Sequence, residues 1–219
     1  MIQFSLAREQ LLKPLQLVSG VVEKRQTLPV LSNVLLEVDG SQLSLTGTDL
    51  EVELVGRVEL SEPASAGAIT VPAKKFLDIV RSLPDDAIIT VQQNEERVQV
   101  ASGRSKFTLS ALAATEFPNV EQDDSSDQYA LPQQLLSQLI EATAFAMAQQ
   151  DVRYYLNGMS LEMHQSMVRT VATDGHRLAM SSRHVDGLDV AERRQVIVPR
   201  KGILELNRLL AEDDQPVQV

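Results

Sequence analysis

The chain contains no cysteine and no tryptophan, and it has no long apolar run. The absence of cysteine excludes disulfide bonds and thiolate metal sites, and it is compatible with a reducing cytosol. A membrane-spanning helix needs roughly 20 consecutive apolar residues, and no segment approaches that length. The opening residues MIQFSLAREQ contain no extended apolar segment, so they do not form a signal peptide. We therefore expect a cytoplasmic protein that does not enter membranes.

Positive charge is also in the minority, because 20 lysine and arginine residues face 30 aspartate and glutamate residues. The net charge of −10 taken alone argues against nucleic-acid binding, since an acidic surface repels phosphates. Only a concentration of the basic residues on one face would answer that objection. Apolar residues are plentiful: they make up 43% of the 219 positions, which is enough for one large domain or two ordinary ones.

Segments in the two halves of the sequence resemble one another in the same order. Val71–Leu83 matches Val198–Leu210, and an acidic turn follows each segment. The offsets between matching residues are all about 124 to 127 positions, an order that chance similarity rarely maintains. We infer a tandem duplication of a unit of ordinary domain length. The matching residues are, in chain order, Gln10 with Gln134, Asn33 with Asn157, Leu36 with Leu161, Thr48 with Thr173, and Val71 with Val198.

The polar stretch at residues 121–128, EQDDSSDQ, is typical of a linker, so we place the two domains at residues 1–125 and 126–219. In the first copy, three alternating runs that predict strands follow the segment ending at Leu83. The second copy ends at Val219, where the first of these runs would begin. We therefore expect the second copy to be incomplete and the chain to be truncated.

Apolar residues at helical spacing predict four helices, and shorter alternating runs predict strands between them. The helices are expected at residues 7–20, 73–83, 132–147 and 201–210. The strands are expected at residues 34–38, 43–46, 52–60, 88–91, 97–100, 107–109, 159–163, 168–172 and 177–181. Alternating strands bury one face, which helices can cover. The expected fold class is α+β, with antiparallel sheets outside and paired helices on the inner side.

Basic residues fall on the expected helices of both copies, after the same Val-Pro dipeptide. Lys74 and Lys75 follow it in the first copy, and Arg200 and Lys201 follow it in the second. The strands and outer loops of the first copy carry many acids. One alternative is that these lysines and arginines form ordinary solvated helix faces. The repetition instead favours one basic face that attracts DNA while the acidic remainder repels it.

Three strings of the second copy resemble signatures of one known family. They are residues 150–158 (QDVRYYLNG), 170–179 (TVATDGHRLA) and 196–202 (VIVPRKG). The strings at residues 12–15 (LKPL), 27–31 (TLPVL) and 45–50 (LTGTDL) in the first copy fit the same family. On these strings, which extend over essentially the whole chain, the protein resembles the bacterial DNA polymerase III beta subunits, or beta sliding clamps.

The resemblance implies a DNA-clamp fold with three similar domains per chain, of which the third is absent here. Two such chains would form a homodimeric ring, with helices lining a central hole and sheets forming the rim. The implied function is that of a non-catalytic processivity factor, which encircles duplex DNA during replication and tethers the polymerase. The implied partners are duplex DNA, a clamp loader, the polymerase III catalytic subunit and other proteins with a clamp-binding motif. No cofactor and no metal is implied.

By the same resemblance, the inner face carries the DNA contacts. Arginine supplies charge for phosphates, and tyrosine rings can stack on bases or lie against sugars. The alternative for the tyrosine pair is a half-buried strand end. The residues implied as DNA contacts are Arg25, Lys74, Gln150, Arg153, Tyr154, Tyr155, Arg200 and Lys201.

The resemblance further implies an apolar groove between the second and third domains that takes a short linear peptide from partner proteins. Glycine would allow close backbone approach, and leucine would supply apolar wall. Because the third domain is missing, only the part of the groove formed by the second domain would be present. The alternative is that Thr173-Asp174-Gly175 forms an ordinary turn and that His176 is a strand-end residue. The implied groove residues are Leu156, Thr173, Gly175, His176, Arg177 and Leu178.

A third implied site is the dimer edge, where the first domain meets the third domain of the other subunit. Phe107 and Leu109 alternate on one expected strand, so they can face the same way. Their alternative role is simple core packing. The implied edge residues are Lys75, Ile79, Arg97, Arg104, Lys106, Phe107 and Leu109.

Two other functions stay open. Asp174 and His176, two residues apart on a strand, would suit the acid/base pair of a hydrolase. However, the chain has no nucleophile elbow, Walker loop or zinc-protease motif, and its three histidines form no recognisable metal set. The other alternative is a free peptide-binding module that forms no ring. We expect the isolated chain neither to self-associate well nor to stay on circular DNA.

Overall fold

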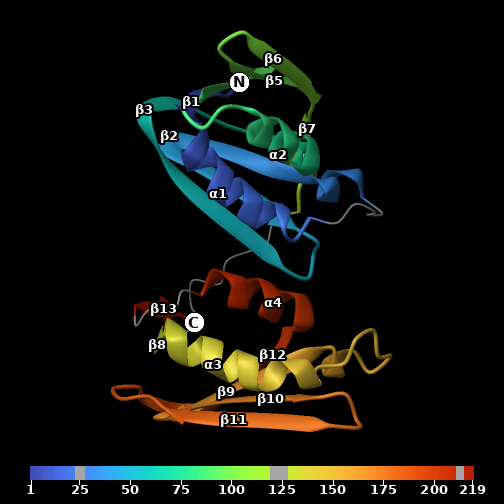
Figure 1. Ribbon diagram of the computed structural model, residues 1–219, viewed down its shortest axis with the longest axis vertical. Coiled ribbons are helices and arrows are strands. Elements are labelled where there is room, and N and C mark those ends of the chain that lie inside the picture. Colours follow the sequence, from blue (N-terminus) through green and yellow to red (C-terminus); the bar gives the residue numbers. More distant parts are fainter. Residues whose placement is uncertain (23–27, 119–127, 211–214) are drawn as a thin grey trace. The chain divides into compact units, whose positions relative to one another are not determined.

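The computed structural model describes residues 1–22, 28–118, 128–210 and 215–219. The chain divides into two compact units, unit 1 (Met1–Glu121) and unit 2 (Gln122–Val219), each with its own hydrophobic core (Figure 1). The boundary expected between residues 125 and 126 lies outside the described residues, as does the acidic turn expected after Leu210. Within the described ranges, none of the helices combines the length and apolar character that crossing a membrane requires.

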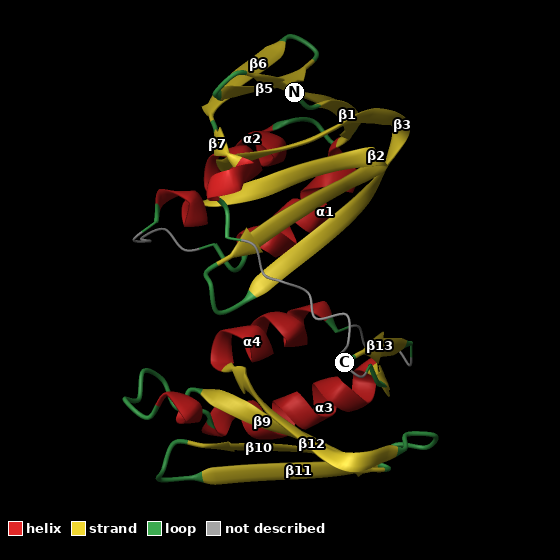
Figure 2. Ribbon diagram, turned by 180° about the vertical axis from the view of Figure 1, so that it is seen from behind, coloured by secondary structure: helices red, strands yellow, loops and turns green. Residues whose placement is uncertain are grey.

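Unit 1 consists of two antiparallel sheets and two helices (Figure 2). One sheet has the strand order β1-β4-β5-β6, and the other has the order β2-β3-β7. The helices α1 and α2 contact each other, and both contact the second sheet. The elements are β1 (Gln3–Ala7), α1 (Arg8–Ser19), the 3-10 turn η1 (Pro29–Ser32), β2 (Asn33–Thr48), β3 (Glu53–Pro72), α2 (Ala73–Ser82), β4 (Ile88–Asn94), β5 (Arg97–Ser102), β6 (Ser105–Ser110), β7 (Leu112–Ala113) and η2 (Ala114–Glu116).

The strands β2 and β3 contain the runs that the sequence predicts as separate strands. Asn33–Val38 pairs with Gly67–Pro72, and Gln42–Thr48 pairs with Glu53–Glu59. The register shifts on both sides of Gly40, whose φ of 57° is left-handed and therefore favours glycine. The long strands thus consist of two paired blocks, which is why the sequence pattern breaks there.

Helix α1 runs through Pro14 rather than ending at it. The sequence predicts a lost hydrogen bond or a kink, because proline has no N–H to donate within a helix. Pro14 lies against the sheet at Gly56, where an added Cβ would be 2.7 Å from the Pro14 Cβ. One turn later, a Cβ at Gly47 would overlap the carbonyl oxygen of Val18. The two glycines therefore allow α1 to approach the sheet closely.

Unit 2 places its helices against a four-stranded sheet with the order β11-β10-β9-β12. A second sheet has two strands in the described part of the unit, β13 and β8. The elements are β8 (Ala130–Pro132), α3 (Gln133–Thr143), η3 (Ala144–Ala146), η4 (Tyr154–Leu156), β9 (Gly158–Gln165), β10 (Met167–Thr173), β11 (Leu178–His184), β12 (Val190–Pro199), α4 (Arg200–Leu209) and β13 (Pro216–Gln218).

The strand pairing of unit 2 repeats that of unit 1. Leu36 pairs with Ile69, and its match Leu161 pairs with Val196. The N-terminal strand of each unit pairs with the strand that follows the second helix: β1 with β4, and β8 with β13. This shared topology supports the tandem duplication and agrees with the expected α+β fold class.

Two expectations about the helices of unit 2 were partly wrong. The helix expected at residues 132–147 ends at Thr143, whose hydroxyl donates to the Leu139 carbonyl at 2.8 Å, and a 3-10 turn follows. In α4, Leu204 was expected on the apolar stripe but is 41% exposed. Glu205 is buried instead, and it accepts a hydrogen bond from Arg208 at 2.6 Å. Periodicity alone does not reveal such an ion pair.

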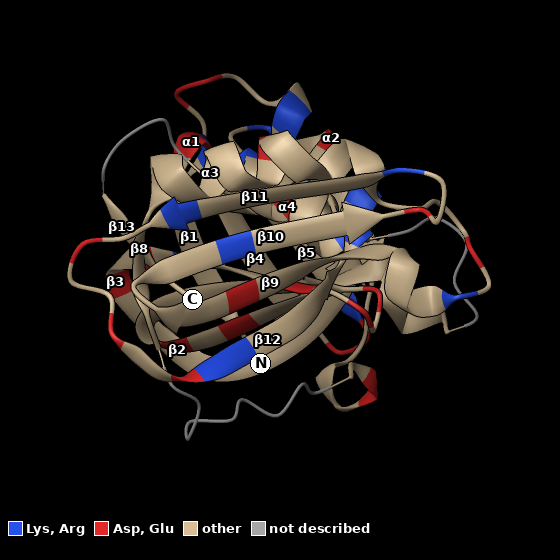
Figure 3. Ribbon diagram, turned by 90° about the horizontal axis from the view of Figure 1, so that it is seen from below, with Lys and Arg blue, Asp and Glu red and all other residues tan. Residues whose placement is uncertain are grey.

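The main sheet of unit 2 carries basic as well as acidic side chains (Figure 3). Arg169, Arg183 and Arg193 lie on β10, β11 and β12. Glu162 on β9 pairs with two of them, at 2.7 Å from Arg193 Nη2 and 3.7 Å from Arg169 Nη1. The separation of acidic strands from basic helices that the first copy suggests does not extend in simple form to unit 2.

Candidate nucleic-acid and peptide interfaces

The loop between η3 and β9 carries four of the expected DNA contacts: Gln150, Arg153, Tyr154 and Tyr155. The backbone N–H of Asp151 donates to Asn157 Oδ1 at 2.9 Å. In return, Asn157 Nδ2 donates to the backbone carbonyl of Asp151 at 2.8 Å. This reciprocal pair closes the loop at its base and fixes the segment that bears the arginine and the tyrosines.

The Asp151 carboxylate orients the Arg153 side chain. Arg153 Nε donates to Oδ1 at 3.0 Å, and Nη2 donates to Oδ2 at 2.9 Å. The Arg153 backbone N–H also donates to Oδ1, at 2.8 Å. These side-chain and backbone hydrogen bonds lower the pKa of Asp151 to about 2, and the same side-chain bond raises the pKa of Arg153. The guanidinium is therefore held in one orientation and partly neutralised.

The Arg153 guanidinium also lies against the turn between β10 and β11. A Cβ added to Gly175 would be 3.0 Å from Arg153 Nη2, and the φ of Gly175 is 89°. His176 is close enough to Asp151 for its charge to contribute to the lowered pKa of that carboxyl. The structure thus brings together Arg153, expected at the DNA interface, with Gly175 and His176, expected in the peptide groove.

The same loop is connected to the start of α4. The backbone N–H of Arg200 donates to the Asn157 carbonyl at 2.9 Å, and Gly158 pairs with Pro199. Arg200 and Lys201 occupy the first turn of α4. Hydrogen bonds in unit 2 therefore join two groups of expected DNA contacts, the loop around Gln150 and the start of α4 at Arg200. These residues are 50 positions apart in the sequence.

In unit 1, Lys74 and Lys75 are exposed in the first turn of α2, where Lys74 matches Lys201 in the first turn of α4. The helices also share a basic residue in the last turn, Arg81 in α2 and Arg208 in α4. Arg25 lies outside the described residues.

Tyr154 and Tyr155 stand in the 3-10 turn η4 and not at a strand end. Their ring centroids are 5.9 Å apart with an interplanar angle of 77°, an edge-to-face contact. Tyr154 is 84% exposed and Tyr155 is 51% exposed. The half-buried strand end considered from the sequence is therefore wrong, and both rings present area to solvent.

Thr173 and Asp174 shape the turn between β10 and β11. Thr173 Oγ1 donates to the Arg177 carbonyl at 2.7 Å and accepts from the Gly175 N–H at 3.1 Å. Asp174 Oδ1 accepts from the backbone N–H groups of Arg177 and His176, at 2.9 and 3.0 Å, and these bonds lower its pKa. Thr48 and Asp49 make the equivalent bonds in unit 1. The Thr-Asp pair is therefore a turn motif of the repeat.

This geometry contradicts the strand placement on which the hydrolase alternative depended. Asp174 and His176 lie in a turn, because β10 ends at Thr173 and β11 begins at Leu178. The Asp174 carboxylate accepts hydrogen bonds from the His176 backbone N–H and from Arg177 Nε, each at 3.0 Å, so its role is to stabilise the turn. Among the described residues, no group of three or more histidine, aspartate and glutamate side chains is arranged to hold a metal ion.

The expected groove residues differ in accessibility. Leu156 is buried, whereas Leu178 is 65% exposed and presents apolar area at the start of β11. Two neighbouring apolar residues that the sequence did not single out, Phe145 and Met180, are 59% and 62% exposed. The Arg177 guanidinium lies 5.7 Å from the centroid of the Phe145 ring, which places this ring beside the expected groove. The apolar spacing in the sequence assigns Phe145 to a helix and gives no sign of this exposure.

Asp151 and Asn157 were also missed as functional residues. Both stand inside a string quoted for the family resemblance, but neither received a role. The signal available was the Asp-x-Arg spacing, because a carboxylate can accept from the backbone and side chain of a residue two positions on.

The expected dimer edge lies on β5, β6 and α2. β6 is an edge strand of its sheet, and Leu109 on it is buried while Phe107 is half-buried against the same core. Both therefore face the core, so part of their role is packing. The charged neighbours Arg97, Arg104 and Lys106 are exposed. Ile79 packs against the core from α2, whereas Lys75 is exposed.

Two similar α+β units in tandem, each with a basic turn opening its second helix, define a protein with DNA-clamp architecture. The family described as DNA polymerase III beta subunit, N-terminal domain, matches residues 2–121. The family described as its central domain matches residues 130–219. The chain belongs to the DNA polymerase III beta subunit family.

Relatives and solved structures agree with this assignment. The chain is 61% identical to the beta sliding clamp of Pseudomonas putida over 216 residues, which cover 99% of this chain and 59% of the relative. It is 54% identical to the beta sliding clamp of Escherichia coli K12 over 217 residues, again 99% of this chain and 59% of the relative. The crystal structure of the DNA polymerase III subunit beta from Pseudomonas aeruginosa matches with a TM-score of 0.94 and 60% identity, covering 99% of this chain and 58% of that chain. The family resemblance and the clamp fold are confirmed, and the chain spans about 59% of the length of these relatives.

Proposed function

We propose that the chain acts as part of a DNA sliding clamp, a non-catalytic subunit that holds DNA polymerase III on duplex DNA in the cytoplasm. The relatives that cover the chain are named beta sliding clamps, and the chain spans 59% of their length. Ring formation and the partners of the complete clamp are therefore part of the proposal.

The proposal depends mainly on one observation: hydrogen bonds join the loop that carries Arg153 to the first turn of α4. Asp151 fixes the Arg153 guanidinium, and Asn157 bonds to Arg200 at 2.9 Å. The exposed tyrosines stand on the same loop. Together these groups offer charge for phosphates and ring faces for sugars or bases.

A clamp that slides is expected to avoid specific pairs with base edges, because such pairs would hold it at one sequence. Lys74, Lys75, Arg200 and Lys201 stand at the starts of α2 and α4, where a long side chain reaches a phosphate without a fixed register. The proposed interface therefore holds DNA mainly by charge, and its affinity is expected to depend on salt and not on sequence.

The proposed test measures binding of this chain to two unrelated linear duplexes by fluorescence anisotropy over a series of salt concentrations. The logarithm of the binding constant should fall with the logarithm of salt concentration by about 0.9 for each phosphate neutralised. The two duplexes should give the same constants. Arg153→Ala and Lys201→Ala should each reduce the slope by about 1.

Arg183→Ala is the matched control, because Arg183 is an exposed arginine on β11 at the far end of that strand from Gly175. It should leave the slope unchanged. The proposal fails if the Arg183 variant lowers the slope as much as the Arg153 variant does, or if the duplexes differ tenfold in affinity.

The apolar side chains near the β10–β11 turn are proposed as one wall of a groove for short linear peptides of the clamp loader, the polymerase III catalytic subunit and other clamp-binding proteins. Leu178, Met180 and Phe145 supply exposed apolar area. Leu178→Ser should weaken binding of an apolar linear peptide, whereas Leu209→Ser, at an exposed leucine on α4, should not. Equal loss in both variants would oppose the assignment.

The outer edge of β6 with its exposed Lys106, and the exposed Arg104 in the turn before it, are proposed to meet a second clamp subunit, as a homodimeric ring requires. Phe107 is the apolar residue of this strand with exposed area left to contribute. In a clamp dimer, charge reversal at Lys106 should raise the dissociation constant, and unchanged dissociation would remove this edge from the interface.

A further inference from the structure

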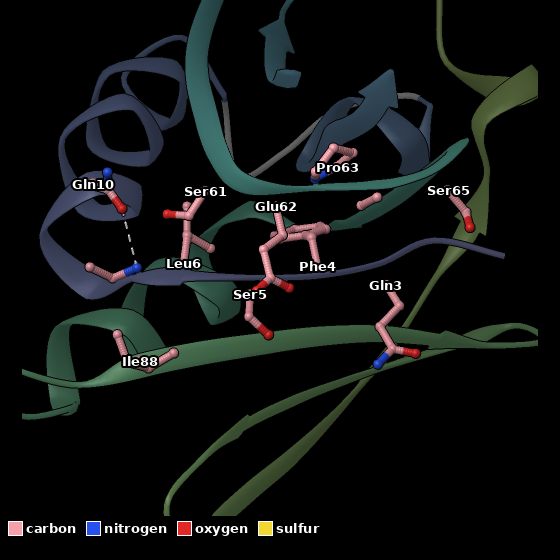
Figure 4. Close-up of a pocket in the computed structure, with 12 residues that line it drawn as sticks. Gln3, Phe4, Ser5, Leu6, Gln10, Ser61, Glu62, Pro63, Ser65 and Ile88 are labelled. Atoms are coloured by element: carbon pink, nitrogen blue, oxygen red, sulfur yellow. Dashed lines mark hydrogen bonds between the residues drawn. The ribbon is translucent and has the colours of Figure 1, made fainter. Parts of the chain in front are cut away.

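A cavity of about 570 Å³ lies in unit 1 between β1 and a turn of β3 (Figure 4). Five consecutive residues of β1, Gln3–Ala7, form one wall, and five consecutive residues of β3, Ser61–Ser65, form the other. Gln10 and Ile88 complete the lining. The volume is in the range of about 300–1,000 Å³ that is usual for binding sites. Two five-residue segments lining the same cavity make a slot that suits an extended chain.

The wall formed by β1 is an unpaired sheet edge. β1 ends the sheet order β1-β4-β5-β6. Gln93 donates its N–H to Ile2, and Arg8 donates its N–H to Ala87, so the even-numbered positions face β4. Backbone groups alternate between the two edges of a strand, so Gln3 and Ser5 direct their N–H and C=O groups into the slot. Within the described chain, no hydrogen bond joins these groups to β3.

The edge of β1 also lacks the protection that edge strands usually carry. Proteins protect such edges with charged residues, prolines or bulges, which discourage a foreign strand from pairing. Of the described edge strands with three or more residues, β1 alone has neither a charged residue nor a proline: its sequence is QFSLA. The other edge strand of this sheet, β6, carries Lys106. An unprotected edge beside an open slot favours pairing with an added strand.

The charges around the slot indicate the kind of segment that fits. Glu62 is exposed and is the only ionisable side chain that lines the cavity, so no lining cation opposes a basic ligand. A second cavity of unit 1, of about 480 Å³, is lined by Ala68 and Ile69 of β3 and also by Glu95, Glu96 and Glu116. The net charge of the chain, −10, acts in the same direction. An extended segment with lysine or arginine is therefore complementary, and an acidic one is repelled.

We propose that the slot between β1 and Ser61–Ser65 binds a basic, extended peptide segment of a partner protein, which adds as a strand to the free edge of β1. The segment would exchange hydrogen bonds with the backbone of Gln3 and Ser5 and place a cationic side chain near Glu62. This site lies entirely in unit 1 and is separate from the proposed DNA and peptide interfaces of unit 2. It requires neither a ring nor DNA.

The test uses this chain and a fluorescein-labelled hexapeptide with valine at alternate positions and lysine between them. A matched peptide carries glutamate in place of lysine. The lysine peptide should bind and should shift the amide resonances of Gln3 and Ser5. The glutamate peptide should bind at least about tenfold more weakly, because its charges meet the same sign.

Ser5→Pro removes the edge N–H while sparing the bonds to β4, since proline is tolerated where the N–H faces away from the sheet. It should weaken the lysine peptide at least about tenfold, because the backbone pairing loses a donor and meets the proline ring. The Ser5 hydroxyl lies 2.9 Å from the Thr90 hydroxyl, and both Ser5→Pro and Ser5→Ala remove this contact. Ser5→Ala keeps the backbone N–H, so it is the matched control. This variant should bind the lysine peptide normally. Glu62→Gln should weaken binding about two- to fivefold, as expected for an exposed ion pair, and Glu192→Gln should not.

Thermal unfolding of each variant shows whether unit 1 is intact before binding is compared. Normal binding by a folded Ser5→Pro variant would overturn the proposal, and so would equal affinity for the glutamate peptide. Resonance shifts confined to unit 2 would also overturn it. If the chain self-associates and Ser5→Pro abolishes this self-association, the edge of β1 binds a second copy of the chain. That result would reject the basic partner segment.

Discussion

The guanidinium of Arg153 lies against the backbone of Gly175, so that a Cβ added to Gly175 would be 3.0 Å from Arg153 Nη2. Arg153 belongs to the loop proposed to contact DNA, and Gly175 belongs to the turn proposed to border the peptide groove. A change in the position of either backbone segment must therefore move the contact that both share. The two proposed interfaces of unit 2 are mechanically connected through one arginine side chain.

This contact predicts that Gly175→Ala disturbs Arg153 as well as the turn. Gly175 has a φ of 89°, which costs a residue with a side chain about 1–2 kcal/mol, and the added methyl group also meets the guanidinium. Gly187→Ala is the matched control, because Gly187 has a φ of 81° and no atom within 4 Å of an added Cβ. Chemical denaturation should show a larger loss of stability for Gly175→Ala. The Arg153 Nε resonance should move in that variant alone, and equal losses with an unmoved resonance would refute the contact.

The hydrogen bonds from Arg153 predict a specific pH dependence for the loop. They lower the pKa of Asp151 from 3.8 to about 2 in the folded state. A lowered folded-state pKa means that the contribution to stability is present above the unfolded pKa of about 3.9 and is lost as pH falls toward 2. Carbon-detected NMR should place the Asp151 carboxyl midpoint near 2, with Arg153 Nε moving in parallel. A midpoint near 4 would show that the pair is not formed in solution, and Asp151→Asn should abolish the parallel movement.

The repeated turn predicts that Thr48→Ala and Thr173→Ala have similar effects on stability. Each threonine hydroxyl donates to a carbonyl four residues on and accepts one N–H, at distances of 2.7–3.1 Å. Each substitution should cost about 1 kcal/mol in chemical denaturation. Only Thr173→Ala should also weaken binding of an apolar peptide, since only its turn borders the proposed groove. A much larger cost at one site would mean that the two turns are not equivalent.

The close approach of α1 to its sheet predicts that the units can be destabilised separately. A Cβ at Gly47 would overlap the Val18 carbonyl oxygen, and backbone atoms cannot move aside as a flexible side chain does. Gly47→Ala should therefore destabilise unit 1 by about 2–4 kcal/mol, while unit 2 has a core of its own. Hydrogen exchange should accelerate at β2 and β3 and stay unchanged at β9 and β10. Acceleration in both units would show that they unfold together.

The sequence was sufficient for the repeat, because ordered matches such as Leu36 with Leu161 reflect equivalent pairing partners. It was not sufficient where a polar contact overrides periodicity. In α4, Glu205 is buried and pairs with Arg208, whereas Leu204 is 41% exposed, and apolar spacing alone does not predict this arrangement. The expected strands at residues 168–172 and 177–181 left Asp174 between them, and only the hydrolase alternative placed Asp174 and His176 on a strand.

The contacts within the candidate site were beyond sequence reasoning for a similar reason. Arg153 and Gly175 are 22 positions apart, and nothing in the intervening pattern predicts their contact. Asp151 orients Arg153 through local hydrogen bonds, and the preceding Gln150 has a φ of 58°, a conformation that composition does not predict for glutamine.

We propose that duplex DNA contacts the first turn of α2 in unit 1, and the first turn of α4 and the loop carrying Arg153 in unit 2. NMR resonance mapping during titration with an unmodified duplex at low salt tests it most directly. We expect the shifts to concentrate at Lys74, Lys75, Arg153, Arg200 and Lys201 and to fade as salt is raised. Shifts concentrated on the arginines of β10, β11 and β12, with these residues unaffected, would contradict it.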